Sequence, residues 1–99
     1  MQKLLSVCII TKNEENNLEK CLKSVKSIAD EIIIVDTGSI DKTLEIAHQF
    51  TDKIFNFEWI DDFSAARNFA LDKATCQFIL SIDADEYIQN PNMLIETLK

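Results

Sequence analysis

The chain has 99 residues, of which 46% are hydrophobic and 27% charged, with one glycine and one proline. This composition excludes a disordered chain, and the length allows one domain at most, which we expect to span residues 1–99. The formal net charge of -7 argues against a nucleic-acid partner, because affinity for a phosphate backbone comes from clustered lysines and arginines. An anionic ligand would therefore need a cation to bridge it to this chain.

The first part of the chain alternates strand-like and helix-like segments. Residues 4–10 form a continuous apolar run of the kind found in parallel strands that are covered on both faces. Apolar residues then recur at i, i+3, i+4 and i+7, which predicts an amphipathic helix over residues 15–28. The recurring residues are Leu18, Cys21, Leu22 and Val25. Residues 32–35 are all isoleucine or valine and predict a second buried strand.

A turn is predicted directly after this second strand. Gly38 is the only glycine and can adopt a positive φ there, which other residues avoid. Ser39 is expected to cap the next helix, and Asp41 is expected near the positive end of that helix. The helix itself is predicted over residues 40–50.

The second part of the chain continues the alternation. Residues 53–57 predict a short strand, residues 63–73 a helix and residues 78–82 a third strongly apolar strand. Pro91 marks the start of a last helix, which is expected to run into Lys99 without a stop signal.

The order of these elements predicts an α/β fold with a mostly parallel sheet and helices on both faces. Nothing after the last helix would complete a doubly wound sheet, so we expect a piece of a larger, Rossmann-like domain. The opening residues have no signal-peptide pattern, and no apolar run is long enough for a transmembrane segment. A cytoplasmic protein is therefore the default expectation.

Several chemically distinctive side chains are predicted to be structural. The cysteines lie in apolar segments without metal-site spacing, which favours buried, reduced thiols at Cys8, Cys21 and Cys76. Four aromatic residues around the third strand are predicted to pack in the core rather than to form a sugar-stacking platform. These aromatic residues are Phe55, Phe57, Trp59 and Phe63. The single histidine, His48, is expected at the surface or in packing.

Polar or acidic residues follow three of the apolar strands where those strands end. Residues 11–14 follow the first strand, Asp36 the second, and residues 83–86 the last. Since the carboxyl ends of parallel strands meet at one edge of the sheet, this edge is the predicted ligand site. Asp83 and Asp85 would repel each other by about 3 kcal/mol at a separation of roughly 5 Å, which favours a shared Mn²⁺ or Mg²⁺. The alternatives are a solvated acidic turn and, for Asp36, a turn-forming carboxylate.

One basic residue stands out near the middle of the chain. Arg67 lies in a helical segment with small neighbours, and its guanidinium group could bind a phosphate in a fork. An ion pair with Asp36 or Asp83 is an equal alternative.

Four motifs in this order resemble the amino-terminal region of glycosyltransferase family 2, from about Leu5 to Tyr87. The four motifs are residues 9–14 at the end of the first strand, residues 31–43, residues 65–68, and the acidic turn at residues 82–86. The resemblance implies the GT-A nucleotide-sugar-binding fold and metal-dependent transfer of a sugar from a nucleoside diphosphate sugar, usually a UDP-sugar. It further implies inversion of the anomeric configuration and a place in bacterial cell-surface polysaccharide or lipopolysaccharide synthesis.

The resemblance also implies roles for individual residues. Nucleoside-lining positions would be Thr11, Asn13 and Glu14. Asp36 would meet the base, and Arg67 would lie near the base or the diphosphate. Asp83 would lie nearer the sugar nucleotide, and Asp85 would hold Mn²⁺ or Mg²⁺ on the diphosphate. No segment before Lys99 matches the family's catalytic base, so none is assigned.

Other functions are compatible with parts of the pattern. A receiver-like signalling domain also has carboxylates at strand ends, but its acidic pair follows the first strand, where this chain has residues 11–13. A phosphatase of the haloacid dehalogenase type likewise has its acidic pair after the first strand. A non-catalytic nucleotide-binding fragment, or a homodimer that buries an unfinished sheet edge, is a further alternative.

Overall fold

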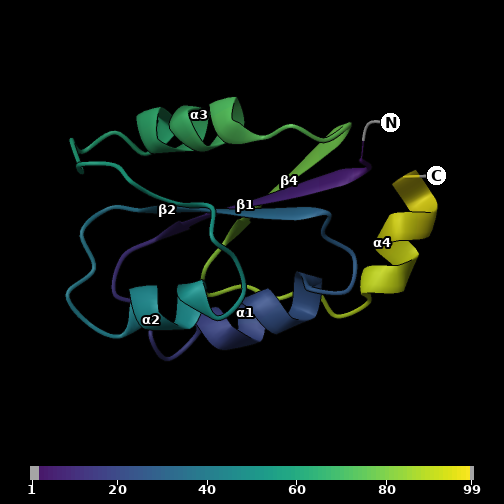
Figure 1. The fold of residues 1–99 in the computed structure, drawn as a ribbon, viewed down its shortest axis with the longest axis horizontal. Helices are drawn as coiled ribbons and strands as arrows, with labels where there is room; N and C mark the ends of the chain where they lie inside the picture. The colour runs from purple at the N-terminus through teal and green to yellow at the C-terminus, as the bar shows by residue number, and fades with distance from the viewer. Residues whose placement is uncertain (1–2, 99) are drawn as a thin grey trace.

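A computed structural model describes residues 3–98 as a three-layer α/β fold (Figure 1). Helices α1 and α2 lie on one face of a four-stranded sheet, and α3 lies on the other. The elements are β1 (Leu5–Thr11), α1 (Leu18–Val25), β2 (Glu31–Asp36), α2 (Thr43–His48), β3 (Ile54–Asn56), α3 (Phe63–Lys73), β4 (Phe78–Asp83) and α4 (Pro91–Leu98). The predicted α/β class and the order of the elements are confirmed. The predicted run of the last helix into Lys99 lies outside the described residues.

The sheet has the strand order β3-β2-β1-β4, and its pairings are all parallel. β1 is central, with Ile9 opposite Ile34 of β2 on one side and Ile82 of β4 on the other. Both β1 and β2 are buried almost throughout, because helices cover both of their faces. β4 instead alternates between more and less exposed residues, as expected for a strand at the edge of the described sheet.

The larger core lies between the sheet and the α1–α2 layer. α1 contributes its predicted apolar stripe, which is completely buried at Leu18, Cys21, Leu22 and Val25. α1 is shorter than predicted, because residues 15–17 form turns that lead into Leu18 and Asn17 makes no side-chain cap. α4 adds partly buried side chains to the same core beside the amino ends of the strands (Figure 1).

A smaller core lies under α3. The helix presents Ala66 and Ala70 to the sheet, where both are buried, and it packs near Cys8, Ile33 and Val35. The predicted aromatic packing is confirmed for two of the four residues, since Phe55 and Phe57 pack with Phe69 in this core. No helix within residues 3–98 is long and apolar enough to cross a membrane.

The predicted cap of the second helix is wrong. α2 begins at Thr43, and the Ser39 hydroxyl donates a hydrogen bond to Asp36 instead. The N-cap residue is Lys42, which makes no side-chain cap. Asp41, one residue earlier, lies near this end of the helix as predicted, and its carboxylate accepts a hydrogen bond of 2.9 Å from the backbone N–H of Thr43. These hydrogen bonds favour the charged form, and they hold the pKa of Asp41 below its ordinary value although desolvation acts in the other direction.

Candidate nucleotide and metal site

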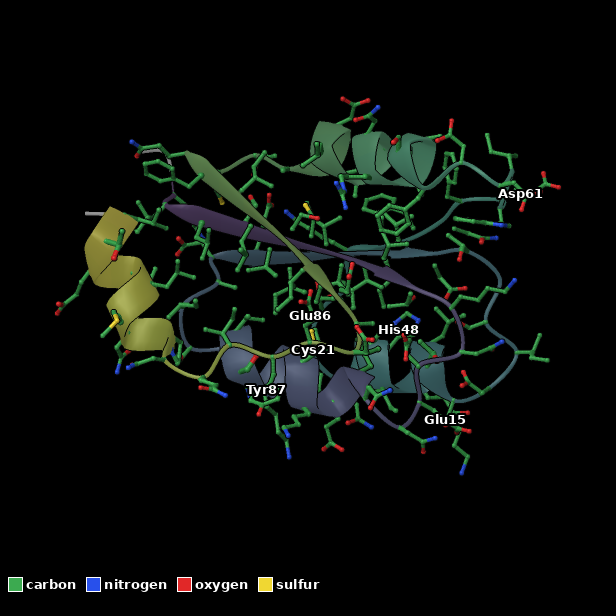
Figure 2. The ribbon with its side chains drawn as sticks, turned by 180° about the vertical axis from the view of Figure 1, so that it is seen from behind. Glu15, Cys21, His48, Asp61, Glu86 and Tyr87 are labelled. Carbon is green, nitrogen blue, oxygen red and sulfur yellow. The ribbon has the colours of Figure 1, made fainter. Side chains whose placement is uncertain are left out.

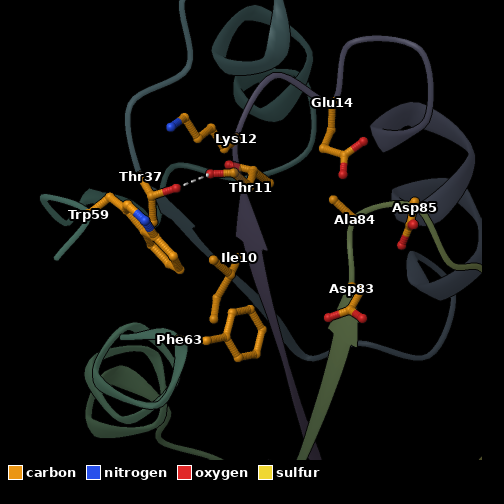
Figure 3. A pocket seen from close by; sticks show the side chains of 10 residues that line it. All are labelled: Ile10, Thr11, Lys12, Glu14, Thr37, Trp59, Phe63, Asp83, Ala84 and Asp85. Atoms are coloured by element: carbon orange, nitrogen blue, oxygen red, sulfur yellow. Dashed lines mark hydrogen bonds between the residues drawn. The ribbon is translucent and has the colours of Figure 1, made fainter. Parts of the chain in front are cut away.

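A cavity of about 330 Å³ opens at the carboxyl ends of β1 and β4. The strand order reverses between these two strands, and in open α/β sheets such a switch point is where ligands bind. Figure 3 shows three carboxylates on one side of the cavity and two aromatic rings on the other. The lining residues are Ile10, Thr11, Lys12, Glu14, Thr37, Trp59, Phe63, Asp83, Ala84 and Asp85.

The acidic side of the cavity consists of Glu14, Asp83 and Asp85 (Figure 3). Asp83 and Asp85 are both exposed, and no ion pair within residues 3–98 involves any of the three. The turn that carries the aspartates is held by a fourth carboxylate, because Glu86 accepts a hydrogen bond of 3.0 Å from the backbone N–H of Asp83. We define Glu14, Asp83 and Asp85 as the acidic rim.

The carboxylates of the acidic rim share one cavity and also act on a neighbouring buried thiol. Burial, together with the negative charges of Glu86 and of the acidic rim, raises the pKa of Cys21 to about 12. The residues that raise this pKa come from two loops that are far apart in the sequence. Of the three predicted clusters, the cavity therefore joins residues from the first and the last, whereas Asp36 borders a neighbouring cavity.

Helix α1 holds the acidic turn from behind. The Cys21 thiol lies 3.7 Å from the carbonyl oxygen of Asp83, and the Ser24 hydroxyl accepts a hydrogen bond of 3.0 Å from the backbone N–H of Ile88. The ammonium group of Lys20 lies 3.9 Å from the centroid of the Tyr87 ring. Figure 2 labels Cys21 on this helix and Glu86 and Tyr87 on the loop that passes it. These contacts anchor the loop that carries Asp83 and Asp85 to helix α1, whose apolar face is buried in the core.

Thr11 and Asp36 form a hydrogen-bonded pair at the ends of the two central strands. The Thr11 hydroxyl donates to the Asp36 carboxylate at 2.9 Å, and both residues are buried. Asp36 also accepts hydrogen bonds from the backbone N–H groups of Gly38 and Ser39 at 3.1 and 2.9 Å, and from the Ser39 hydroxyl. Asp36 therefore shapes the loop after β2, as the turn-forming alternative predicts. It borders a neighbouring cavity that also contains His48 and Asn56.

Asn13 joins the loops that follow β1 and β2. Its side-chain oxygen accepts a hydrogen bond of 2.8 Å from the backbone N–H of Ile40, and its own N–H donates to the Ser39 hydroxyl at 2.9 Å. Its φ of 54° lies in the left-handed region, which asparagine tolerates better than most residues.

Arg67 lies away from the acidic rim. It is exposed on α3, and its guanidinium carbon lies 4.9 Å from the centroid of the Phe63 ring. Neither of the predicted ion pairs, with Asp36 or with Asp83, is present. Of the predicted site residues, the fold brings Thr11, Glu14, Asp83 and Asp85 to the cavity. Asn13, Asp36 and Arg67 are not among its lining residues.

Sequence reasoning missed the aromatic side of the cavity. Trp59 and Phe63 are 39% and 42% exposed and line the cavity, so their predicted burial in the core is wrong. The reason is the place of Phe63 at the first position of α3, because the buried face of this helix consists of Ala66 and Ala70. Two adjacent acidic residues, Asp61 and Asp62, are the signal in the sequence that this loop is not core.

The carboxylates of the acidic rim fit a divalent cation that arrives with a phosphate ligand. No group of three or more His, Cys, Asp or Glu side chains within residues 3–98 is arranged to hold a metal ion alone. Mg²⁺ typically takes one or two protein carboxylates and completes its octahedron with water and substrate phosphates. Asp83 and Asp85 would offer two such oxygen ligands, and neither has a lysine or arginine ion-pair partner among the described residues.

Comparisons with known proteins identify relatives of this chain. A family model described as Glycosyl transferase family 2 matches residues 6–98. A TPR repeat-containing protein of Synechococcus elongatus is 49% identical over 82 residues, which is 83% of this chain and 20% of that protein. An uncharacterized glycosyltransferase of Rickettsia bellii is 42% identical over 86 residues, which is 87% of this chain and 29% of that protein.

Solved structures share the fold. S. aureus TarS in complex with UDP superposes with a TM-score of 0.74 at 26% identity, covering 95% of this chain and 31% of that chain. Glucosyl-3-phosphoglycerate synthase of Mycobacterium tuberculosis, in complex with Mg²⁺ and UDP, has a TM-score of 0.72 at 20% identity, covering 86% of this chain and 35% of that chain. The chain thus has the GT-A, Rossmann-like fold and spans only a fifth to about a third of these proteins.

Proposed function

This chain belongs to glycosyl transferase family 2. On this premise we propose that it binds a nucleoside diphosphate sugar as the donor-binding part of a glycosyltransferase. The donor is a UDP-sugar, and the sugar passes to an acceptor hydroxyl with inversion of the anomeric configuration. The pathway is the synthesis of a cell-surface polysaccharide or lipopolysaccharide. Residues 1–99 form one partial domain of this enzyme.

The observation that carries the proposal is the acidic rim at the switch point of the sheet. A diphosphate is an anion, and Glu14, Asp83 and Asp85 alone would repel it. A divalent cation between the rim and the diphosphate reverses the sign of this interaction. The solved relatives with UDP, and with UDP and Mg²⁺, support this choice of ligand.

Each predicted site residue has a role in this proposal. Asp85 and Asp83 hold Mn²⁺ or Mg²⁺, and Asp83 also lies near the sugar nucleotide. Thr11, Asn13 and Glu14 frame the nucleoside, and Glu14, as part of the acidic rim, also faces the metal-bound diphosphate. Asp36 meets the base through the loop that its hydrogen bonds to Gly38 and Ser39 hold in place. Arg67 is expected near the base or the diphosphate, and its place over the Phe63 ring, away from the acidic rim, favours the base.

The residues of this chain bind and orient the donor. The metal ion, when bound, supplies Lewis-acid stabilisation of the charge on the departing nucleoside diphosphate. The rim fixes the position of the diphosphate, because α1 anchors the acidic turn through Cys21 and Ser24. We assign no catalytic base to this chain.

Calorimetric titration of the 99-residue chain with UDP tests the proposal. We expect binding in Mn²⁺ or Mg²⁺ and a loss of about tenfold or more in affinity when the metal is removed with EDTA. Asp85→Asn should cause a similar loss even with metal present. Asp52→Asn, a change of the same kind at an exposed residue remote from the rim, should leave the affinity unchanged. Equal affinity with and without metal would contradict the metal site.

A non-catalytic nucleotide-binding fragment is the alternative function. It predicts the same UDP affinity but no sugar transfer. Release of UDP from a UDP-sugar in the presence of candidate acceptors separates the two, since only a transferase releases UDP in proportion to glycosylated acceptor.

A further inference from the structure

The cavity has two walls of opposite chemistry. The acidic rim forms one wall, and Trp59 and Phe63 form the other, with Ile10 between them (Figure 3). Trp59 lies beside Thr37, which follows β2, whereas Asp83 ends β4 on the far side. A ligand held by its phosphates at the rim would therefore extend its remaining part toward the two rings.

Contacts within the chain hold both rings of the aromatic wall. The indole N–H of Trp59 donates a hydrogen bond of 2.9 Å to Asp61, so that the ring offers its face rather than its donor to a ligand. Asp61 itself has a φ of 58°, in the left-handed region. Arg67, which does not line the cavity, lies over the Phe63 ring. Both rings thus have partners that fix their orientation while remaining partly exposed.

We propose that Trp59, supported by Phe63, is the surface on which the nucleobase of the bound nucleotide stacks, an assignment that rests on the proposed function. A flat base gains dispersion and stacking energy against an indole face, whichever hydrogen-bond donors and acceptors the base carries. The hydroxyl groups of the donor sugar are better matched by the opposite wall, where exposed carboxylates accept hydrogen bonds. Thr37 and Lys12 line the same cavity as Trp59, where they could contact the edge of the base.

The single tryptophan of the chain makes the proposal directly measurable. UDP with Mn²⁺ should quench the fluorescence of Trp59, with a midpoint that matches the calorimetric affinity. Pyrophosphate with Mn²⁺ occupies the acidic rim without a base and should leave the fluorescence almost unchanged. The comparison of the two ligands isolates the base.

Substitutions give a second measurement. Trp59→Ala should weaken UDP about 5- to 100-fold, the range expected for loss of one stacked base, and Trp59→Phe should retain most of the affinity. Phe63→Leu should weaken UDP to a smaller extent. Ile60→Ala, at an exposed residue that does not line the cavity, is the matched control. The affinity for pyrophosphate should be the same in all four variants, which a general disturbance of the site would not allow.

The outcomes are separable from the test of the proposed function. If UDP binds the unsubstituted chain in a metal-dependent way but neither quenches Trp59 nor loses affinity in Trp59→Ala, the stacking assignment is wrong and the function stands. If Trp59→Ala lowers the affinity for a UDP-sugar but not for UDP, the aromatic wall contacts the sugar rather than the base, and the stacking assignment is equally wrong. If UDP does not bind the unsubstituted chain at all, both proposals fall.

Discussion

The buried thiols of Cys8 and Cys21 lie on opposite faces of the sheet, and we expect neither to react with alkylating reagents in the folded chain. Burial raises the pKa of Cys8 to about 11, with a contribution from the charge of Glu31, and burial raises the pKa of Cys21 to about 12. A thiol reacts as its thiolate, so iodoacetamide at about pH 8 should label only the half-buried Cys76 in the folded chain. Mass spectrometry of the labelled chain measures this.

Unfolding provides the control for the thiol prediction. In concentrated urea, all three cysteines should be labelled at similar rates, because the burial that protects two of them is lost. Labelling of Cys21 in the folded chain as fast as Cys76 would contradict the arrangement of α1 against the acidic turn.

The sequence predicted which residues reach the site only where a residue follows the end of a buried strand. Asp83 and Asp85 follow an apolar run that could only be a strand, so their place at the carboxyl edge follows from the run itself. Trp59 lies on a loop and Phe63 at the start of a helix. At such positions no repeating pattern of apolar residues shows whether a ring faces the core or a cavity. Ser39 looked like a helix cap because no local signal shows that Asp36 competes for its hydroxyl.

At the scale of elements, α3 is positioned by the small size of its packed face. Ala66 and Ala70 are both buried against the sheet, and the carbonyl oxygen of Ala70 lies 3.7 Å from the Cys8 thiol. A larger side chain there has to displace the helix that carries Phe63. Ala70→Leu should therefore lower the free energy of unfolding by about 1–3 kcal/mol, as overpacking typically does. Urea unfolding followed by circular dichroism measures the change.

The matched change on the solvent side of the same helix is Asp72→Leu. Asp72 is exposed, so this variant adds the same side chain without intruding on the core and should stay within about 0.5 kcal/mol of the parent. Equal destabilisation by both variants would contradict close packing of α3 as the cause.

Element types were more predictable than element lengths or pairings. The 3.6-residue stripe of α1 and the apolar runs of β1 and β2 depend on burial that the sequence displays directly. α2 is shorter than predicted because Asp41 and Thr43 end the preceding loop with their own hydrogen bonds. The place of β4 beside β1 rather than β3 depends on contacts between distant segments, which no local pattern contains.

At the scale of the whole molecule, the carboxylate of Glu31 accepts hydrogen bonds from segments that are far apart in the chain, at the edge of the sheet where the strands begin. Glu31 opens β2 and accepts a hydrogen bond of 2.6 Å from the Ser6 hydroxyl of β1. It also accepts one of 2.5 Å from the Lys53 ammonium and two from Thr75, before β4, at 2.6 and 3.0 Å. Burial opposes the charge of Glu31, but these hydrogen bonds outweigh it and lower the pKa to about 2 from an ordinary value of 4.5.

This lowered pKa predicts how the stability of the whole chain depends on acid. Because the folded-state pKa lies below the unfolded value, the stabilisation is complete above about pH 5 and is lost as the pH falls toward 2. Its size is about 3 kcal/mol at most, since the Lys53 partner is half exposed and screened by solvent. Glu31→Gln should therefore be less stable than the parent at neutral pH, and the difference should shrink as the pH falls through this range. Urea unfolding midpoints of both chains at several pH values measure it, and a difference that does not change with pH would show that the charge of Glu31 contributes nothing.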